Sequence, residues 1–500
     1  MDTARRVEVR VTASGVPPHD PLELYERLRA ETGDRNVFLL ESSGDTGAEG
    51  RGAVVGVNPV AEIRVFARHV EIDGAPGVVA ALSRAAEETG AVPEGAPSGT
   101  VRLPLRDREE IWRLLPAAQG VFAVDTDVPV TEHAFGFLAS LAYEAVWHVE
   151  SLPGRDDPGR GPDMVLALFR DTVGYDPDTG SARLLTAQSP LFGARQVTPR
   201  RVAELAACAA EAAPAPVPGA PEPLGVQDTV SRGTFLGWAE RCLEHIRVGD
   251  VYQIQIGHRI DVRTALSPLD LYRRLRARNP SPYMYLAPRA GSLLIGASPE
   301  LFVRVEGDGI EMRPIAGTAR RGLDEAENER RVKEMQESAK ERAEHIMLVD
   351  LCRNDIGRVC RPGTLPVDRL MAVERFSHVF HLVSTVTGRL ARDADTWDAV
   401  RATFPAGTMS GAPKVRAMEI IDGLEQERRG SYAGAVGLLD VRGRAELALC
   451  IRSVEYDGDT YSTQSSAGMV AQSDPESEWR ETLAKMGAAY WALTGKELQA

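Results

Sequence analysis

The stretch Arg313-Pro314-Ile315-Ala316-Gly317-Thr318-Ala319-Arg320-Arg321-Gly322 follows an alternation of apolar residues at 301, 303 and 305 and a Gly-Asp-Gly turn at 307–309. The alternation predicts a strand with one buried face, and the turn predicts a hairpin. A small-residue turn between three arginines can hold an anionic ligand, because glycine permits a close backbone approach and guanidinium suits carboxylates. An ordinary hairpin leading into a basic helix start fits the same residues, so this stretch alone leaves both interpretations open.

The composition of the 500 residues is that of a globular protein of two domains or one large one, with 43% hydrophobic and 26% charged residues. The formal net charge of −14 argues against a nucleic-acid binder, whose surface would be basic. No apolar run of about 18 residues predicts a membrane span, and no signal core follows the N-terminus. The five scattered cysteines lack metal-ligand spacing and fit a reducing compartment. We therefore expect a cytoplasmic protein that binds neither nucleic acid nor membrane.

A proline-rich segment at 213–223 indicates a linker, which divides the chain into an N-terminal domain at 1–225 and a second domain at 226–500. Beyond the linker, the hydrophobic pattern predicts one long helix over Glu325–Val349 and one strand over Glu446–Tyr456. Strands in runs with separate helices indicate an α+β fold rather than alternating βαβ units.

Two pairs of glutamates are candidates for a metal site. Glu341 and Glu344 are three residues apart, as are Glu478 and Glu481, so on helices each pair lies on one face. Two such helices facing each other would give the all-oxygen site that Mg²⁺ prefers. Charged pairs at this spacing also occur on solvated surfaces. Each pair lies where its predicted helix turns apolar, which is where a buried charged site would have to be.

Two further features are candidates for ligand binding or catalysis. The small-residue loop 404–414 opens a predicted helix, whose free N–H groups can bind an anion, but its spacing does not match a nucleotide P-loop. His381 lies in a strand-like run, where a hydrogen-bonded core histidine and a catalytic one are both open interpretations. The sequence contains neither a Gly-x-Ser-x-Gly elbow nor a His-Glu-x-x-His zinc motif.

The ordered motifs resemble those of the chorismate-utilising enzymes, and most closely anthranilate synthase component I. The resemblance is strong over about 230–490 and implies a layered sandwich of large antiparallel β-sheets flanked by helices. The motifs that carry it are Gly249–Gln253, Ser298–Glu300, Pro314–Thr318, Glu341–His345, Asp350–Asp355, Gly407–Lys414 and the helix of Glu478 and Glu481.

The resemblance also implies a role for individual residues. Glu300 matches the general acid that protonates the leaving oxygen of chorismate, and His381 and Thr408 match residues near the elimination of pyruvate. Mg²⁺ would be held by Glu344 and Glu481, with Glu341 and Glu478 in the same network, and would engage the ring carboxylate. The residues expected to contact substrate, several of them at a carboxylate, are Gly317, Thr318, Tyr432, Arg452, Ala467, Gly468 and Lys485.

The nucleophile is indicated by two side chains that are absent. Family members that add water use a lysine base where this chain has Gln253, and members that make 4-amino-4-deoxychorismate use a nucleophilic lysine where it has Ala316. The remaining nucleophile is ammonia. The resemblance thus implies anthranilate synthase activity, with loss of pyruvate. A synthase of 2-amino-2-deoxyisochorismate that retains the enolpyruvyl group is the alternative, and a non-catalytic ligand sensor of the same fold is a third interpretation.

The resemblance further implies partners and regulation. No cysteine lies in a Gly-x-Cys-x-Gly elbow, so ammonia would come from a separate glutamine amidotransferase subunit in a hetero-oligomer. A tryptophan feedback pocket would include Glu41, Ser42, Pro282, Tyr283 and Met284. The segments 255–259 and 136–144 depart from the usual pattern of the family, which leaves open whether the chain serves tryptophan synthesis or a specialised pathway.

Overall fold

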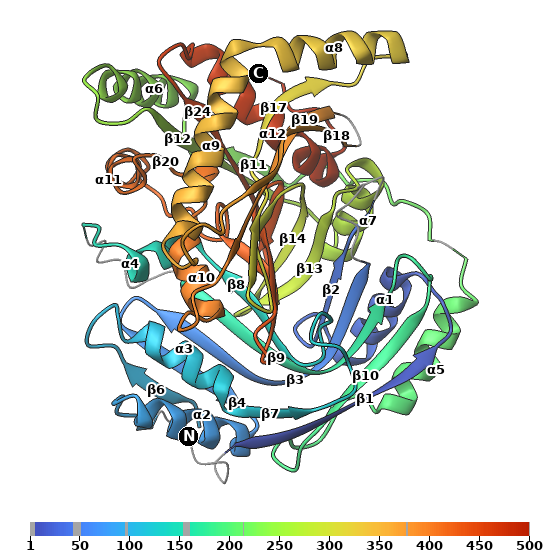
Figure 1. The fold of residues 1–500 in the computed structure, drawn as a ribbon. Helices are drawn as coiled ribbons and strands as arrows, with labels where there is room; N and C mark the ends of the chain where they lie inside the picture. The colour runs from blue at the N-terminus through green and yellow to red at the C-terminus, as the bar shows by residue number, and fades with distance from the viewer. Residues whose placement is uncertain are drawn as a thin grey trace.

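The computed structural model describes residues 6–43, 52–95, 99–153, 161–213, 215–376 and 379–499. Its strands form one hydrogen-bonded network of 24 strands that divides into two branches at β3 (Ala53–Phe66) and β9 (Met164–Tyr175), which pair along their lengths (Figure 1). Among the described strands, β1 (Val7–Val16) and β7 (Phe122–Asp125) pair in parallel and the other ladders are antiparallel.

The first branch leaves β3 through β2 (Val37–Glu41) and ends at β12 (Gln253–Arg263). Between them lie, in order of pairing, β13 (Tyr283–Arg289), β14 (Ser292–Ser298), β23 (Ser453–Tyr456) and β24 (Tyr461–Met469). In the last ladder, Gln255 is paired with Gly468.

The second branch leaves β9 through β8 (Gly136–Leu141) and ends at β19 (Val379–Arg389) with its neighbours. The strands in order of pairing are β21 (Ala435–Asp440), β22 (Ala445–Leu449), β15 (Leu301–Glu306), β16 (Gly309–Met312) and β19, which also pairs with β17 (Ile315–Arg320) and β18 (Val367–Arg375). The other strands are β4 (His69–Gly74), β5 (Glu94–Gly95), β6 (Val101–Pro104), β10 (Ala182–Gln188), β11 (Gly225–Asp228) and β20 (Gly411–Ala412).

The inner faces of the two branches pack on each other, and helices cover the outer faces. Buried Phe38 and Ala287 from the first branch contact Leu138 and Leu438 from the second. The helices are α1 (Pro21–Thr32), α2 (Pro76–Glu88), α3 (Ile111–Gly120), α4 (Val146–Val149), α5 (Pro199–Ala210), α6 (Arg232–Arg247), α7 (Pro268–Arg278), α8 (Glu325–Glu337), α9 (Ala339–Gly357), α10 (Thr396–Thr403), α11 (Lys414–Leu424) and α12 (Pro475–Thr494). The expected α+β sandwich is confirmed.

Strands from both sides of residue 225 share this network. β2 pairs with β13, and β8 pairs with β21, so each side supplies hydrogen-bond partners to the other. The boundary at 225 between domains 1–225 and 226–500 stays a prediction.

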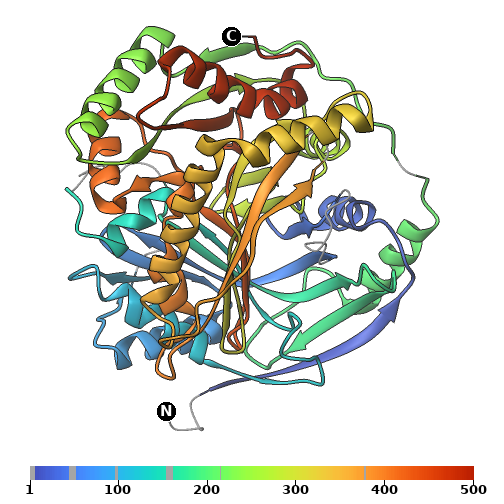
Figure 2. The same cartoon turned by 45° about the horizontal axis from the view of Figure 1, so that its top comes forward.

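Two predicted elements are broken in the structure, each at a single residue. The helix expected over Glu325–Val349 divides at Ser338, which ends α8 and whose hydroxyl accepts a hydrogen bond from the Glu341 amide at the start of α9. Figures 1 and 2 show the two helices leaving this point in different directions. The strand expected over Glu446–Tyr456 is interrupted before β23, where Arg452 has a φ of +53°. Both interruptions lie beside predicted site residues.

Candidate active site

Glu300 lies in the turn between β14 and β15 and is buried. Burial raises the pKa of its carboxyl to about 8, although the Thr408 hydroxyl, which donates a hydrogen bond to its Oε1 at 3.2 Å, acts in the opposite direction. The carboxyl is therefore protonated at neutral pH, which is the form that a general acid requires.

A bulge in β17 brings backbone into the site. The register of β17 against β19 shifts between Ala316 and Thr318, and Gly317 has a φ of +75°. A methyl group at Gly317 would lie 3.2 Å from a carboxylate oxygen of Glu341, so the backbone passes close to the first glutamate pair.

His381 lies opposite this bulge on β19. Its Nδ1 is 2.9 Å from the Gly317 carbonyl oxygen, which can only accept, so Nδ1 carries the proton. Burial lowers the pKa of the ring to about 4. The neutral ring therefore presents an unprotonated Nε2, which can take up a proton.

The arginines beside the bulge do not form an anion-binding turn. Arg313 is buried and forms an ion pair with Glu374 at 2.5 Å, while Arg320 is exposed at the end of β17. The expectation of an anion-binding turn between arginines is therefore modified. The stretch contributes its small-residue backbone to the site, whereas Arg313 is paired with Glu374 and Arg320 is exposed.

The two glutamate pairs face each other across α9 and α12. Burial raises the pKa of Glu344, and repulsion from Glu341, Glu478 and Glu481 raises it further. Burial also raises the pKa of Glu478, with Glu481 adding to the shift. Burial alone would raise the pKa of Glu481, but the Lys485 ammonium at 2.6 Å brings the net shift below the usual value.

These four carboxylates fit a hard divalent cation in their chemistry. All are oxygen donors, three are partly or fully buried, and their mutual repulsion would be relieved by Mg²⁺. Among the described residues no three acidic, histidine or cysteine side chains are already in ligand geometry, so the side chains would have to close around the ion. The Mg²⁺ assignment stays a prediction.

Cationic groups lie beside this cluster. Arg452 is half-buried, burial lowers the pKa of its guanidinium, and within the described ranges no carboxylate lies within ion-pair distance of it. Its Nη1 donates to the Lys485 carbonyl oxygen at 2.7 Å, and the Lys485 ammonium donates to the Ser466 carbonyl oxygen at 2.9 Å. The Lys485 charge also acts on Glu300 and His381. An arginine without a carboxylate partner is a binding group for an anionic ligand.

The remaining residues that are predicted to contact substrate lie at or beside the β12–β24 ladder. Gln253 is buried on β12, and in the part of the chain that the structure describes its Oε1 has no hydrogen-bond partner. A methyl group on Gly468 would lie 3.0 Å from the Gln253 Nε2, and Ala467 is the buried neighbour of Gly468. Tyr432 is buried, and its hydroxyl is 2.6 Å from the Ser466 hydroxyl on β24.

A family model described as chorismate binding enzyme matches residues 82–490. The chain belongs to the chorismate-binding enzyme family. It is 45% identical over 494 residues to 2-amino-4-deoxychorismate synthase from Streptomyces globisporus, covering 98% of each chain. It is also 45% identical over 380 residues to anthranilate synthase component 1 from Streptomyces coelicolor, covering 73% of this chain and 74% of the relative.

A solved structure supports the same assignment. The crystal structure of anthranilate synthase component I from Streptococcus pneumoniae superimposes with a TM-score of 0.69 at 28% identity, over 87% of this chain and 91% of that chain. The resemblance to the family is thereby confirmed, and this chorismate-binding enzyme acts on chorismate.

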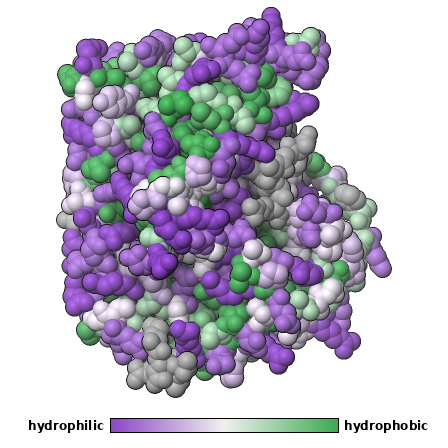
Figure 3. Space-filling model, viewed as in Figure 1, coloured by the Kyte–Doolittle hydropathy of each residue, from purple (hydrophilic) through white to green (hydrophobic). Residues whose placement is uncertain are grey.

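Three further observations concern the cysteines, the helices and one face of this chorismate-binding enzyme. Cys242, Cys352 and Cys450 are buried, and burial raises the pKa of each thiol, so none of them is a ready thiolate nucleophile for glutamine hydrolysis. No helix within the described ranges is both long and apolar enough to cross a membrane. In Figure 3, hydrophilic residues cover most of the visible face, and hydrophobic residues gather in its upper part.

The residues that are predicted to bind tryptophan also lie together in this chorismate-binding enzyme. The buried Glu41 carboxylate accepts hydrogen bonds from Tyr272 at 2.6 Å and Arg276 at 2.9 Å. The Ser42 hydroxyl donates to the Pro282 carbonyl oxygen at 2.8 Å, and Met284 is paired with Glu41. Tyr283 is the first residue of the same strand, and its hydroxyl lies 3.3 Å from the Arg304 guanidinium. Tryptophan binding itself stays a prediction.

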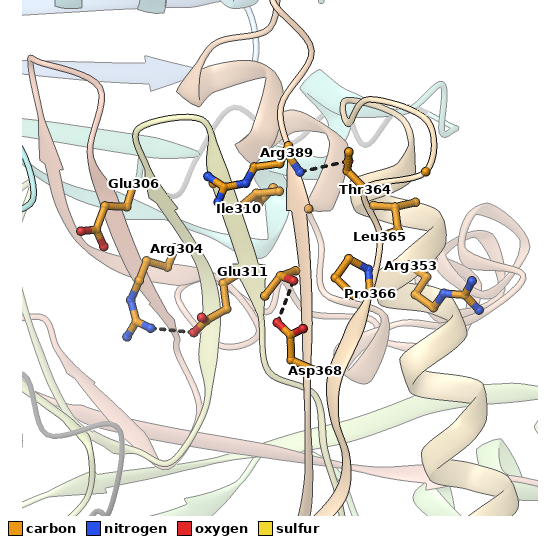
Figure 4. Close-up of a pocket in the computed structure, with 14 residues that line it drawn as sticks. Arg304, Glu306, Ile310, Glu311, Arg353, Thr364, Leu365, Pro366, Asp368 and Arg389 are labelled. Atoms are coloured by element: carbon orange, nitrogen blue, oxygen red, sulfur yellow. Dashed lines mark hydrogen bonds and ion pairs between the residues drawn. The ribbon is translucent and has the colours of Figure 1, made fainter.

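A cavity of about 950 Å³ lies outside this site, between β15, β16, β18 and β19 (Figure 4). Its charged walls are paired within the protein: Arg304 with Glu311 at 2.6 Å, and Arg389 with Asp308 at 2.6 Å. It contains none of the residues that match the family's site. The Glu300 region, and not this cavity, therefore stays the candidate active site.

The structure adds residues that sequence reasoning missed. Buried Arg429 forms an ion pair with Glu425 at 2.8 Å and donates to the carbonyl oxygens of Met409 at 2.8 Å and Gln255 at 2.9 Å. It thus ties the loop of Thr408 to β12. Gln255 was noticed in the sequence only as a departure from the family, although its spacing of two from Gln253 already placed both on one face of a strand.

Proposed function

We propose that the chain catalyses the Mg²⁺-dependent amination of chorismate at C2, with ammonia from a separate glutamine amidotransferase subunit, to give 2-amino-4-deoxychorismate. This product carries an amino group on C2 and no oxygen on C4, so it has the same substitution pattern as 2-amino-2-deoxyisochorismate. The observation that carries the proposal is the full-length similarity, 98% of each chain at 45% identity, to the synthase of that name.

The reaction assigns a task to each group in the site. Ammonia forms a bond to C2, the ring double bonds shift, and the C4–O bond breaks. Glu300, protonated at neutral pH, gives its proton to the leaving oxygen, which departs as water, and the new ammonium group returns a proton to the medium. Mg²⁺ on Glu344, Glu481, Glu341 and Glu478 would supply a positive charge for the ring carboxylate. Arg452 and Lys485 would hold the second carboxylate.

The nucleophile is ammonia because the site lacks the side chains that the other reactions of the family need. The neutral amide of Gln253 cannot deprotonate water, and Ala316 cannot form a covalent amine intermediate. Ammonia needs no base once it arrives uncharged. No cysteine of the chain lies in a Gly-x-Cys-x-Gly elbow, which supports delivery of ammonia by another polypeptide.

Anthranilate synthase activity is the second candidate, and His381 favours it. Conversion of the amino intermediate into anthranilate removes the C2 proton and breaks the C3–O bond, which releases pyruvate. The Nε2 of His381 carries no proton and can accept this one, although the pKa of about 4 makes the ring a weak base.

Product analysis separates the two candidates. Purified chain is incubated with chorismate, Mg²⁺ and an ammonium salt, and products are followed by mass, anthranilate fluorescence and pyruvate release. We expect an aminated product that retains the enolpyruvyl group and no pyruvate. Anthranilate with an equal amount of pyruvate would establish the second candidate, and absence of any aminated product would reject both. Glu300→Gln serves as the matched inactive control.

A further inference from the structure

Two glutamine side chains of β12 converge on one point of the site. Gln253 and Gln255 are 6% and 8% exposed and point to the same face of the strand. A methyl group on Gly468 would lie 2.8 Å from the Gln255 Nε2 and 3.0 Å from the Gln253 Nε2. Both amide nitrogens therefore meet over the Cα of Gly468, where glycine leaves room for them.

A hydrogen-bond chain connects Gln255 to Ser466 and Tyr432. The Ser466 hydroxyl donates to the Gln255 Oε1 at 2.9 Å and lies 2.6 Å from the Tyr432 hydroxyl. A serine hydroxyl has one proton, and here that proton is on the bond to Gln255. The Tyr432 hydroxyl is consequently the donor to Ser466 and offers only lone pairs to a ligand.

Gln255 is left with a donor that has no acceptor. Among the described residues, no acceptor lies within hydrogen-bond distance of its Nε2. The Nε2 is not sealed in the core: it keeps access to solvent, so a ligand can reach it. The free N–H groups thus point to a ligand that accepts hydrogen bonds.

The surroundings identify that ligand as an anion. The Lys485 ammonium, which is ion-paired with Glu481 at 2.6 Å, also donates to the Ser466 carbonyl oxygen at 2.9 Å. Arg452 donates to the Lys485 carbonyl oxygen at 2.7 Å, and in the described chain Glu481 acts on its charge only from beyond ion-pair distance. Chorismate has two carboxylates. If the ring carboxylate faces the glutamate cluster, as the proposed function has it, the carboxylate of the enolpyruvyl arm faces these cations.

We propose that Gln255 is a substrate-binding residue, whose Nε2 donates to the enolpyruvyl carboxylate in place of the Tyr432 hydroxyl. The proposal rests on the proposed function for the identity of the ligand. It differs from the role that the family resemblance gives to Tyr432, because in this chain the tyrosine proton is used on Ser466. Gln255 belongs to the segment in which the sequence departs from the family.

In the competing arrangement, donor and acceptor are exchanged in each hydrogen bond between Gln255, Ser466 and Tyr432. With the Gln255 amide turned over, its Nε2 would donate to Ser466, Ser466 would donate to Tyr432, and Tyr432 would donate to the carboxylate. The two arrangements predict opposite consequences for two single substitutions, Gln255→Glu and Tyr432→Phe.

Chorismate binding is measured by titration calorimetry with Mg²⁺ present and ammonia absent, so that no turnover occurs. Gln255→Glu keeps the shape and the acceptor for Ser466, but it replaces the donor with an oxygen and adds a negative charge. Gln255→Met has neither the donor nor the charge, so it separates the lost hydrogen bond from charge repulsion. We expect Gln255→Glu to weaken binding about 10- to 100-fold, the usual worth of a hydrogen bond to a charged group. Tyr432→Phe is expected to weaken binding by no more than about threefold.

A loss in Tyr432→Phe equal to or greater than that in Gln255→Glu would overturn the proposal, as would unchanged binding in Gln255→Glu. Thermal melting checks that each variant is folded. If Gln255→Glu does not fold, Gln255→Met replaces it, with an expected loss of about tenfold. Because ammonia is absent, the comparison does not depend on the product, and failure of the proposed function would appear separately as a wild-type chain that binds chorismate but aminates nothing.

Discussion

The Thr408 hydroxyl donates a hydrogen bond of 3.2 Å to Oε1 of Glu300, across a separation of more than a hundred residues in the sequence. Burial raises the pKa of Glu300 to about 8, and this bond limits the rise because it stabilises the ionised form. Folding thus sets the protonation state of the group proposed to be the general acid.

The pH dependence of turnover follows from this pKa. The protonated carboxyl is the active form, so kcat expressed per concentration of neutral ammonia is expected to be constant below pH 8 and to fall as pH rises through about 8. Stopped assays of aminated product over a pH series measure this profile. Glu300→Gln should lower kcat by about 10²- to 10⁴-fold and remove the pH dependence. An unchanged alkaline limb in Glu300→Gln would assign the titration to another group.

Substitution of Thr408 should shift the pH at which kcat falls. Thr408→Val removes the donor that favours the carboxylate, so the pKa of Glu300 rises and the fall in kcat shifts to higher pH. The pH profile of the variant, recorded beside wild type, measures the shift. Thr408→Ser keeps the hydroxyl and is the matched control, expected to behave as wild type. A limb that moves to lower pH would contradict the assignment.

The metal prediction has a readout besides activity. Mg²⁺ that binds only the folded chain raises its melting temperature. Glu344→Gln removes one carboxylate and its repulsion with Glu341, Glu478 and Glu481, so we expect the metal-free variant to melt no lower than wild type and to gain little from added Mg²⁺. Differential scanning calorimetry with and without Mg²⁺ tests this. Glu337→Gln, on the exposed part of α8, is the control and should keep the full Mg²⁺ effect.

The choice of nucleophile can be tested at Gln253. A lysine at this buried position would lose solvation, its pKa would fall, and its neutral fraction could take a proton from water. Gln253→Lys is therefore expected to yield a hydroxylated product, detected by mass, at the expense of the aminated one. Gln253→Met offers no base and should reduce amination without any hydroxylated product. If both variants give the same products, the side chain does not select the nucleophile.

The buried Arg429–Glu425 pair should be a major contributor to stability. Arg429→Met would remove the charge that is paired with the buried Glu425 carboxylate, at a cost of about 3–5 kcal/mol in the free energy of unfolding. The double variant Arg429→Met with Glu425→Gln should recover part of that loss. Urea denaturation measures both. The exposed pair Arg232 and Glu476 provides the control, since Arg232→Ala should cost less than about 1 kcal/mol.

Sequence patterns were sufficient for the residue types and for the elements that follow one hydrophobic period. The spacing of Glu478 and Glu481 predicted that both lie on one face of a helix, and both residues do lie in α12. The breaks at Ser338 and Arg452 were not predicted. Each depends on a local conformation, a cap or a positive φ, that the neighbouring hydrophobic period does not record.

The sequence by itself determined the family, the α+β class and the absence of the two lysines at Gln253 and Ala316, because these are properties of residue identity and order. Only the tertiary structure decided that Arg313 is paired with Glu374, that the pKa of Glu300 is raised to about 8, and that the Tyr432 hydroxyl lies 2.6 Å from the Ser466 hydroxyl. These depend on burial and on which side chains from distant strands meet, and both are set by how the two branches of the sheet pack.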